Sequence, residues 1–158
     1  MQVYLDNSAT TKVCKEAADK AYEVMTEGYG NPSSLHSLGN NAAKELKSAR
    51  NTILDKFGGG NKSQLIFTSS GTESDNMAII GTFNRLKRRA DEIITTQVEH
   101  PAVLEACKYL EKHGAKVKYL RVDSECKINL DELRSEISEK TALISVMTVN
   151  NETGSIMP

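Results

Sequence analysis

Residues 143–149 read Leu-Ile-Ser-Val-Met-Thr-Val, a run that is apolar almost without alternation. Such a run is typical of a β-strand covered on both faces, which is the usual environment of strands in parallel sheets. We therefore expect residues 142–149 to form a strand at the centre of a sheet.

The chain before this strand alternates between strand-like and helix-like patterns. Strand candidates are the short apolar or β-branched runs at residues 3–5, 65–68, 93–96, 117–122 and 142–149. Helix candidates are residues 15–27, 41–57, 73–89, 102–113 and 130–138. This alternation implies parallel strands joined by helical crossovers, which is the α/β class.

Several predicted helix boundaries carry physical markers. Asn129 followed by Glu132 resembles a capping box, and Pro101 stands where a first-turn proline loses no helical hydrogen bond. Gly114 suits the left-handed residue after a helix, and the glycines at 58–60 end the helix before them. These residues predict where three helices begin or end.

Composition and charge exclude several classes of protein. The 158 residues are about one domain if ~150 residues per domain is the norm. Twenty Lys and Arg against twenty-one Asp and Glu leave a net charge of −1, which disfavours binding to nucleic acid or to an anionic membrane. No run approaches the ~18 apolar residues of a membrane span, and the amino terminus lacks a secretory signal, so we expect a cytoplasmic protein.

The cysteines argue against disulfides and metal binding. Cys14, Cys107 and Cys126 are odd in number and widely spaced, with no CxxC pair and no histidine at zinc-finger spacing. We therefore expect three reduced thiols and no metal site.

Residues 67–74, Phe-Thr-Ser-Ser-Gly-Thr-Glu-Ser, join a predicted strand to a predicted helix through small, hydroxyl-rich residues. Free N–H groups and the positive dipole end of a helix start can hold an anion there. Gly71 would let the backbone approach a ligand closely, and the Thr72 hydroxyl could donate to a phosphate oxygen. Alternatively, Ser70 or Thr72 simply caps the helix. The residues alone leave both interpretations open.

The tripeptide Glu99-His100-Pro101 falls at the carboxyl end of another predicted strand. Ligands of open α/β sheets bind at that edge, where an imidazole can stack on a flat ring and exchange protons near neutral pH. The alternative is an ordinary surface or core histidine. His36 and His113 have weaker claims, since His113 lies at a helix end that favours a cation for structural reasons.

The tripeptide Asn150-Asn151-Glu152 follows the most apolar strand and reaches the same edge. Two amides and a carboxylate are costly to desolvate without partners, which favours a ligand or a dense hydrogen-bond network. A turn is the alternative, because Asn is a favoured turn residue. Three loops are thus predicted to converge on one edge of the sheet.

Five segments together carry a resemblance to a known family. They are residues 4–11 (Tyr-Leu-Asp-Asn-Ser-Ala-Thr-Thr), 30–36 (Gly-Asn-Pro-Ser-Ser-Leu-His), 67–76, 99–104 (Glu-His-Pro-Ala-Val-Leu) and 146–154 (Val-Met-Thr-Val-Asn-Asn-Glu-Thr-Gly). In this order they resemble the cysteine desulfurases of the NifS/IscS type. These are pyridoxal 5′-phosphate (PLP) enzymes of the class V aminotransferase group. The resemblance runs over the whole chain but covers only the amino-terminal part of a full-length member.

The resemblance implies the aspartate aminotransferase-like fold of PLP-dependent transferases, three layers around a mostly parallel sheet, here truncated. Residues 1–15 would be the leading segment of the small domain. Residues 16–158 would be the amino-terminal part of the PLP-binding large domain.

The resemblance also implies roles for four residues. Gly71 and Thr72 would bind the cofactor phosphate. His100 would stack on the pyridine ring and act as a catalytic residue in proton transfers, and Asn151 would lie beside the cofactor. Ser70 stands where relatives often have glycine, a departure that the phosphate-binding loop should tolerate if its dihedral angles are ordinary.

Three groups that the family needs have no candidate in this chain. The lysine that forms the Schiff base, the aspartate that pairs with the pyridine nitrogen and the cysteine that accepts sulfur all lie beyond Pro158 in the family. Cys14, Cys107 and Cys126 do not match that cysteine. The chain looks cut short, and we expect it to show no turnover and at most weak, reversible PLP binding.

The activity implied for the intact enzyme is conversion of L-cysteine to L-alanine. The sulfur passes to an enzyme persulfide for iron–sulfur cluster assembly or another sulfur-requiring pathway. The resemblance implies a homodimer that delivers sulfur to an acceptor or scaffold protein. Two alternatives stay open: another class V enzyme, such as a selenocysteine lyase or an aminotransferase, or a non-catalytic binding or assembly fragment.

Overall fold

The computed structural model describes residues 3–60 and 63–158, which form two compact units that separate between Phe67 and Thr68. The first unit contains the helices α1 (Lys15–Thr26) and α2 (Ser37–Lys56). The second contains, in chain order, α3 (Gly71–Leu86), β1 (Glu92–Thr96), α4 (Pro101–Lys112), β2 (Lys116–Leu120), α5 (Leu130–Glu136) and β3 (Thr141–Ile144). The domain boundary expected at residue 15 stays a prediction.

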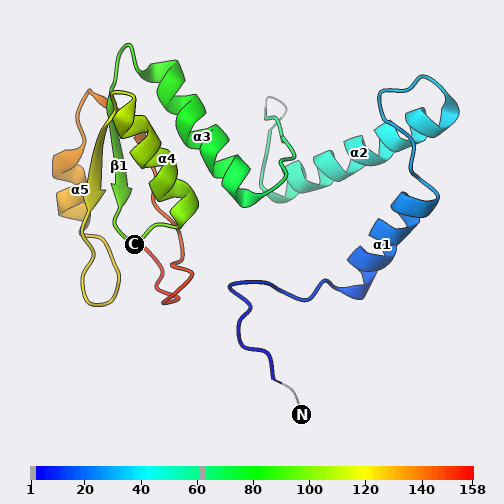
Figure 1. The fold of residues 1–158 in the computed structure, drawn as a ribbon, viewed down its shortest axis with the longest axis horizontal. Coiled ribbons are helices and arrows are strands. Elements are labelled where there is room, and N and C mark those ends of the chain that lie inside the picture. Colours follow the sequence, from blue (N-terminus) through cyan, green and yellow to red (C-terminus); the bar gives the residue numbers. More distant parts are fainter. Residues whose placement is uncertain (1–2, 61–62) are drawn as a thin grey trace. The chain divides into compact units, whose positions relative to one another are not determined.

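The second unit is built on a parallel three-stranded sheet in the order β2-β1-β3 (Figure 1). Ile93 of β1 is in register with Val117 on one side and with Leu143 on the other. The expected alternation of helices and parallel strands is therefore confirmed from α3 onward.

Helices cover the two faces of this sheet. Successive residues of a strand point to opposite faces, and the central strand β1 shows this directly. Ile93 packs with Phe83 of α3 and Leu110 of α4, whereas Ile94 packs in a second cluster with Leu133 of α5. Figure 1 shows α3 and α4 on one side of β1 and α5 on the other. The unit is a three-layer α/β arrangement: the alternation of the sequence predicts the α/β class, and the resemblance implies the three layers.

In the sheet formed by the described residues, the prediction that residues 142–149 form the central strand is wrong. The strand β3 ends at Ile144 and lies at one side of β1, and Val149 makes only an isolated bridge with Ile156. In β1, residues 93–96 are all buried, whereas β3 is half-buried and Ile144 is 40% exposed. An apolar run predicts a strand but not its place in the sheet, because place depends on which strands pair.

Two further predicted strands are not formed. Residues 3–5 and 65–68 have no regular secondary structure and pair with no neighbouring strand in the described part of the chain. Leu5, Ile66 and Phe67 are accordingly exposed. A strand needs a partner for its backbone N–H and C=O groups, and β-propensity alone does not supply one.

The predicted helix markers are confirmed. The Asn129 side chain accepts hydrogen bonds from the backbone N–H groups of Asp131 and Glu132, at 2.8 and 3.3 Å. Pro101 is the first residue of α4. Gly114 and Gly58 adopt φ values of 94° and 67°, in the left-handed region, directly after α4 and α2.

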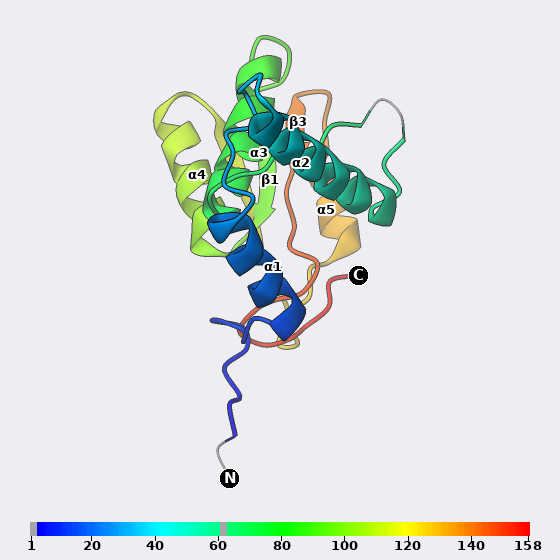
Figure 2. The ribbon, with the colours of Figure 1, turned by 90° about the vertical axis from the view of Figure 1, so that its right-hand side faces the viewer.

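The first unit has little buried interior. The loop 27–36 connects α1 to α2 (Figure 2). Gly39 is the only fully buried residue of these two helices. A β-carbon on Gly30 would lie 2.4 Å from the Leu38 carbonyl oxygen, and one on Gly39 would lie 2.4 Å from the Ser34 carbonyl oxygen. The loop therefore packs on the start of α2 so closely that both positions require glycine.

The described residues provide three further observations. None of their helices is long and apolar enough to span a membrane. They contain no cluster of three or more His, Cys, Asp or Glu side chains that could hold a metal ion. The three cysteines are free thiols: Cys14 is exposed, Cys126 is partly exposed and Cys107 is buried.

Candidate active site at the carboxyl edge of the sheet

The start of α3 combines a helix cap with unused hydrogen-bond donors. The Ser70 side chain accepts a hydrogen bond from the Glu73 N–H at 3.3 Å, and Glu73 in turn accepts from the Ser69 N–H at 2.6 Å. No hydrogen bond among the described residues uses the Thr72 hydroxyl or the N–H groups of Gly71 and Thr72. Ser70 is thus the cap, and the donors of the next two residues remain available for an anion.

Gly71 adds open space to these donors. A β-carbon built on Gly71 meets nothing within 4 Å, so no protein atom near this residue requires a glycine. The space above its backbone is open to a ligand that approaches the start of α3. The two interpretations left open by the sequence are therefore compatible, because different residues serve the cap and the free donors.

The Glu73 carboxylate strengthens the start of α3. Its hydrogen bonds from the N–H and hydroxyl of Ser69 lower the pKa of the Glu73 carboxyl below its usual range. The carboxylate therefore stays charged at neutral pH and complements the positive end of the helix dipole.

His100 is the N-cap of α4. Its Nδ1 accepts a hydrogen bond from the Ala102 N–H at 3.1 Å, and the side chain is exposed. Because Nδ1 acts as an acceptor, the proton of the neutral ring sits on Nε2, and the cap restrains the ring orientation. The sequence did not predict this capping role, although His36 shows the same arrangement at the start of α2, with Nδ1 accepting from Gly39 N–H at 3.3 Å.

His113 serves a different purpose. Its ring packs against Tyr109 with centroids 4.1 Å apart, and its Nδ1 lies 2.7 Å from the Tyr109 carbonyl oxygen. His113 follows the last residue of α4, at the opposite end of that helix from His100. The structural role expected from the sequence is therefore what the structure shows.

Asn150 and Asn151 stand in a tight turn. The Gly154 N–H donates to the Asn150 carbonyl oxygen at 2.8 Å, and Gly154 adopts a φ of 74°. Asn150 is 3% exposed, whereas Asn151 is exposed and donates through Nδ2 to the Glu152 carboxylate at 2.9 Å. The structure therefore contains both the turn and the hydrogen-bond network that the sequence analysis considered. Because Asn151 is exposed, its side-chain amide is the one that a ligand can reach.

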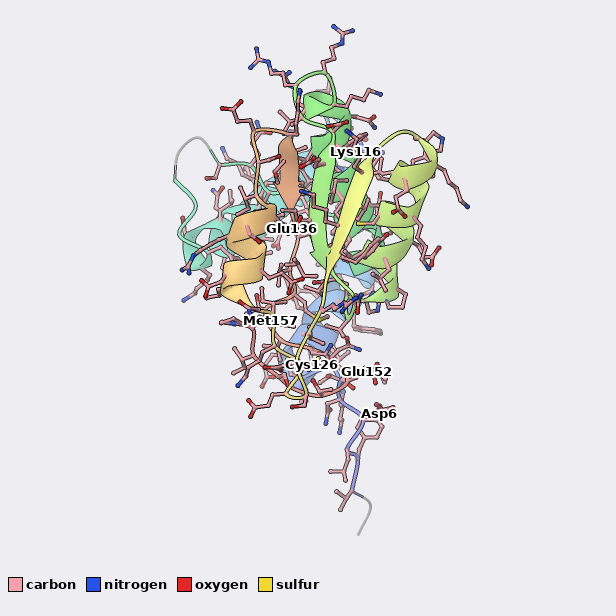
Figure 3. All side chains as sticks on the ribbon, turned by 90° about the vertical axis from the view of Figure 1, so that its left-hand side faces the viewer. Asp6, Lys116, Cys126, Glu136, Glu152 and Met157 are labelled. Carbon is pink, nitrogen blue, oxygen red and sulfur yellow. The ribbon has the colours of Figure 1, made fainter. Side chains whose placement is uncertain are left out.

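The topology brings these loops to one edge. The strands are parallel, so the carboxyl ends of β1 and β3 lie on the same side of the sheet, together with the start of α4. Figure 3 shows Lys116 at the amino end of β2, and Glu152 and Met157 at the opposite end. The start of α3 lies at that same end in Figure 1. Gly71 and Thr72 at the start of α3, and His100 and Asn151 in the loops, therefore all lie at the carboxyl edge.

Two buried side chains connect the loops at this edge. In the sequence analysis, Glu99 has no role of its own and Asn150 is considered only as part of the tripeptide 150–152. Glu99 is 6% exposed and accepts a hydrogen bond from the Met147 N–H at 2.7 Å. Asn150 donates through Nδ2 to the Val98 carbonyl oxygen at 3.1 Å. The sequence did contain one signal, namely polar residues directly beside His100 and Asn151 at strand ends. This signal predicts that the two loops lie close together, but it does not predict which atoms pair.

Burial dominates the electrostatics of Glu99. Desolvation raises the pKa of its carboxyl, and the nearby Asp75 charge acts in the same direction. Hydrogen bonds from the Met147 N–H and the Thr96 hydroxyl lower the pKa and oppose the effect of burial without cancelling it. The edge thus contains a carboxyl group that holds its proton to a higher pH than an exposed glutamate does.

A family model described as Aminotransferase class-V matches residues 3–158. The chain belongs to this family. A cysteine desulfurase of Nostoc sp. is 44% identical to this class-V aminotransferase chain over 156 residues, which are 99% of the chain and 38% of the relative. Cysteine desulfurase NifS of Azotobacter vinelandii is also 44% identical over 156 residues, which are 99% of the chain and 39% of the relative.

Solved structures give the same result for the fold. A NifS-like protein superposes on the class-V aminotransferase chain with a TM-score of 0.95 at 40% identity, covering 100% of this chain and 43% of that one. A protein named SspA, solved in complex with cysteine, superposes with a TM-score of 0.87 at 32% identity, covering 98% of this chain and 44% of that one. The chain corresponds to the amino-terminal part of the cysteine desulfurases and spans about 38% of the length of such relatives.

Proposed function

We propose that this chain is the amino-terminal part of a PLP-dependent cysteine desulfurase. The observation that supports it best is the set of free donors at Gly71 and Thr72, which share the carboxyl edge of the sheet with His100 and Asn151. The chain that carries them is 44% identical to cysteine desulfurases. The complete enzyme would convert L-cysteine to L-alanine and pass the sulfur to a protein cysteine as a persulfide.

The start of α3 fits the phosphate group of PLP. The free N–H groups of Gly71 and Thr72 and the Thr72 hydroxyl would donate to phosphate oxygens, and the helix dipole would favour the negative charge. The open space at Gly71 admits the phosphate close to the backbone. PLP supplies an electron sink for the carbanion chemistry of amino acids, and the protein supplies its orientation.

His100 would contact the pyridine ring with its own ring face. The Ala102 N–H holds Nδ1, so the ring is positioned before any ligand arrives, and Nε2 carries the proton that the neutral ring can donate in a hydrogen bond. To take up a proton, the ring would have to give up the Ala102 hydrogen bond at Nδ1. Asn151 would lie beside the cofactor, where its side-chain amide exchanges its bond to Glu152 for one to the bound molecules. Both assignments are part of the proposal.

The remaining parts of the proposal concern groups and partners outside this chain. The Schiff-base lysine, the aspartate for the pyridine nitrogen and the sulfur-accepting cysteine would come from the rest of the enzyme. The 158 residues alone would then bind PLP weakly and show no turnover. We further propose a cytoplasmic homodimer that delivers sulfur to an acceptor or scaffold protein for iron–sulfur clusters or another pathway.

The test uses the full-length protein that contains this chain, reconstituted with PLP and given L-cysteine. Equimolar L-alanine and sulfide in the presence of a thiol reductant is the expected result. His100→Ala should lower kcat by about a hundredfold or more, the size of a general acid–base contribution. The matched control is His113→Ala at the other end of α4, which should leave kcat unchanged.

Three results would overturn the proposal. The first is absence of alanine from L-cysteine in the PLP-loaded full-length protein. The second is release of selenium from L-selenocysteine with no sulfide from L-cysteine, which would assign the chain to a selenocysteine lyase. The third is transamination of L-cysteine without sulfur release, which would equally exclude a desulfurase.

A further inference from the structure

We propose that Glu99 and Asn150 are positioning residues, whose side chains hold the loops of His100 and Asn151 together at the carboxyl edge of the sheet. The part of this inference that concerns the cofactor rests on the proposed function. The part that concerns the two loops rests only on contacts within the second unit.

Glu99 links the end of β1 to the segment after β3. Its Oε1 accepts from the Met147 N–H at 2.7 Å and from the Thr96 hydroxyl at 3.4 Å. Thr96 is fully buried in the central strand, so the carboxyl group is anchored to the centre of the sheet. Any movement of the Met147 segment away from β1 would break this bond.

Asn150 makes the reciprocal link. Its Nδ2 donates to the Val98 carbonyl oxygen at 3.1 Å, while its Oδ1 accepts from the N–H groups of Glu152 and Thr153 at 3.0 and 2.9 Å. One side chain therefore shapes the turn that presents Asn151 and ties that turn to the strand end that presents His100.

The two links stand where the backbone pairing has stopped. The last backbone bond between the segments of β1 and β3 runs from the Ser145 N–H to the Ile94 carbonyl oxygen, at 2.9 Å. Beyond it, the described structure has no backbone–backbone hydrogen bond between residues 97–100 and 146–151. The hydrogen bonds that set the spacing of the two loops therefore come from the side chains of Glu99 and Asn150.

Each link lies one residue from a side chain of the candidate site. Glu99 precedes His100, and Asn150 precedes Asn151. A buried polar group at each position is costly without a partner, and here each finds its partner on the opposite loop. Misplacement of a site residue by ~1 Å can cost about a hundredfold in rate, so this spacing matters for any ligand held between the loops.

The test compares three variants in the full-length protein. Glu99→Gln keeps an oxygen acceptor for the Met147 N–H, whereas Glu99→Ala removes it. Asn150→Asp keeps the acceptor that shapes the turn but removes the donor to Val98. A matched control is Leu110→Ala, which opens the core at the far end of α4 and destabilises the fold without touching either loop.

Two readouts apply to every variant: hydrogen exchange of the Met147 amide, measured without added cofactor, and the dissociation constant and absorption spectrum of added PLP. Glu99→Ala should speed Met147 exchange by about tenfold or more and weaken PLP binding by about tenfold with an altered spectrum. Asn150→Asp should act in the same direction. Glu99→Gln should stay within about threefold of the parent in both readouts, and Leu110→Ala should lower the melting temperature with PLP affinity and spectrum unchanged.

The outcomes separate this inference from the proposed function. If Glu99→Ala leaves Met147 exchange unchanged, or if Leu110→Ala perturbs PLP as strongly as Glu99→Ala does, the positioning role is overturned while the desulfurase proposal stands. If Glu99→Gln fails to preserve both readouts, positioning through this hydrogen bond is also overturned. If the parent protein binds no PLP at all, the proposed function fails together with the cofactor part of the inference. The exchange rate of the Met147 amide then tests by itself whether Glu99 and Asn150 hold the two loops together.

Discussion

The backbone N–H of Met147 donates to the buried carboxyl group of Glu99, 48 residues away in the chain, at 2.7 Å. This bond joins the end of β1 to the segment that follows β3. The carboxyl group of Glu99 is also buried, and burial disfavours its charged form. The stability of the folded protein should therefore depend on pH.

Glu99 makes stability depend on pH in a defined direction. Because burial raises its pKa in the folded protein, the native state holds this proton to a higher pH than the unfolded state, whose carboxyl titrates near ~4.3. The stabilisation by Glu99 is therefore fully present below that value and is lost as pH rises through the raised pKa. Glu99→Gln cannot ionise, so its stability relative to the parent should increase across this window and then level off.

The measurement for Glu99 is denaturant unfolding of both proteins at a series of pH values from about 3 upward, so that the series begins well below the unfolded pKa. A difference in unfolding free energy that stays constant with pH would show that Glu99 titrates normally in the folded state. The difference at low pH serves as the reference, because both side chains are then neutral.

Substitutions at Ser70 and Thr72 should have different effects, one on the stability of the protein and the other on anion binding at the start of α3. Ser70→Ala removes the cap on the Glu73 N–H and should lower the unfolding free energy by about 1 kcal/mol. Thr72→Ala removes a hydroxyl that no described residue uses, so stability should stay within ~0.5 kcal/mol of the parent.

The second readout for this pair is PLP titration of the full-length protein. Thr72→Ala should weaken PLP binding by roughly tenfold, the worth of one hydrogen bond to a charged group. A Thr72→Ala variant that unfolds more easily yet binds PLP like the parent would reverse the assignment of the two residues.

Thr95 and Thr96 offer a matched pair in the central strand. Both are fully buried, but the Thr95 hydroxyl has no hydrogen-bond partner among the described residues, whereas the Thr96 hydroxyl donates to Glu99. Thr95→Val should therefore raise the unfolding free energy by about 1 kcal/mol, and Thr96→Val should lower it by a similar ~1 kcal/mol. Chemical denaturation measures both, and loss of stability in Thr95→Val would point to a buried water that partners the hydroxyl.

The cysteines should differ sharply in reactivity. Burial raises the pKa of the Cys107 thiol to about 11, so at pH 8 only about one molecule in a thousand carries the reactive thiolate there. Cys14 is exposed in the first unit. Brief treatment with iodoacetamide followed by peptide mass spectrometry should modify Cys14 and leave Cys107 protected until the protein is unfolded. Rapid modification of Cys107 in the folded protein would contradict its burial.

The local patterns of the sequence were sufficient for the helices and for two of the three strands. Pro101, Asn129 and Gly114 act within one turn of their own position, so their effects on helix ends can be predicted without knowledge of the fold. The assignments of residues 3–5 and 65–68 as strands failed for the complementary reason. A strand depends on a hydrogen-bonding partner that can lie anywhere in the chain.

In the candidate site, too, some features could be predicted from the sequence and others could not. The alternation of strands and helices was enough to place His100 and Asn151 at one edge, because parallel strands put all their carboxyl ends together. The capping bond between His100 and Ala102 follows from a helix start but was not predicted, since histidine is an uncommon N-cap.

By itself the sequence determined the α/β class, most helix ends and the set of loops that reach the carboxyl edge, because each depends on periodicity or on contacts within a few residues. Tertiary structure alone decided that β1 lies at the centre, that Thr95 lacks a partner and that Glu99 meets Met147 while Asn150 meets Val98. The last two of these contacts join residues about fifty positions apart in the chain. Which atoms pair across such a distance depends on strand order and register, and neither is written in the local pattern of residues.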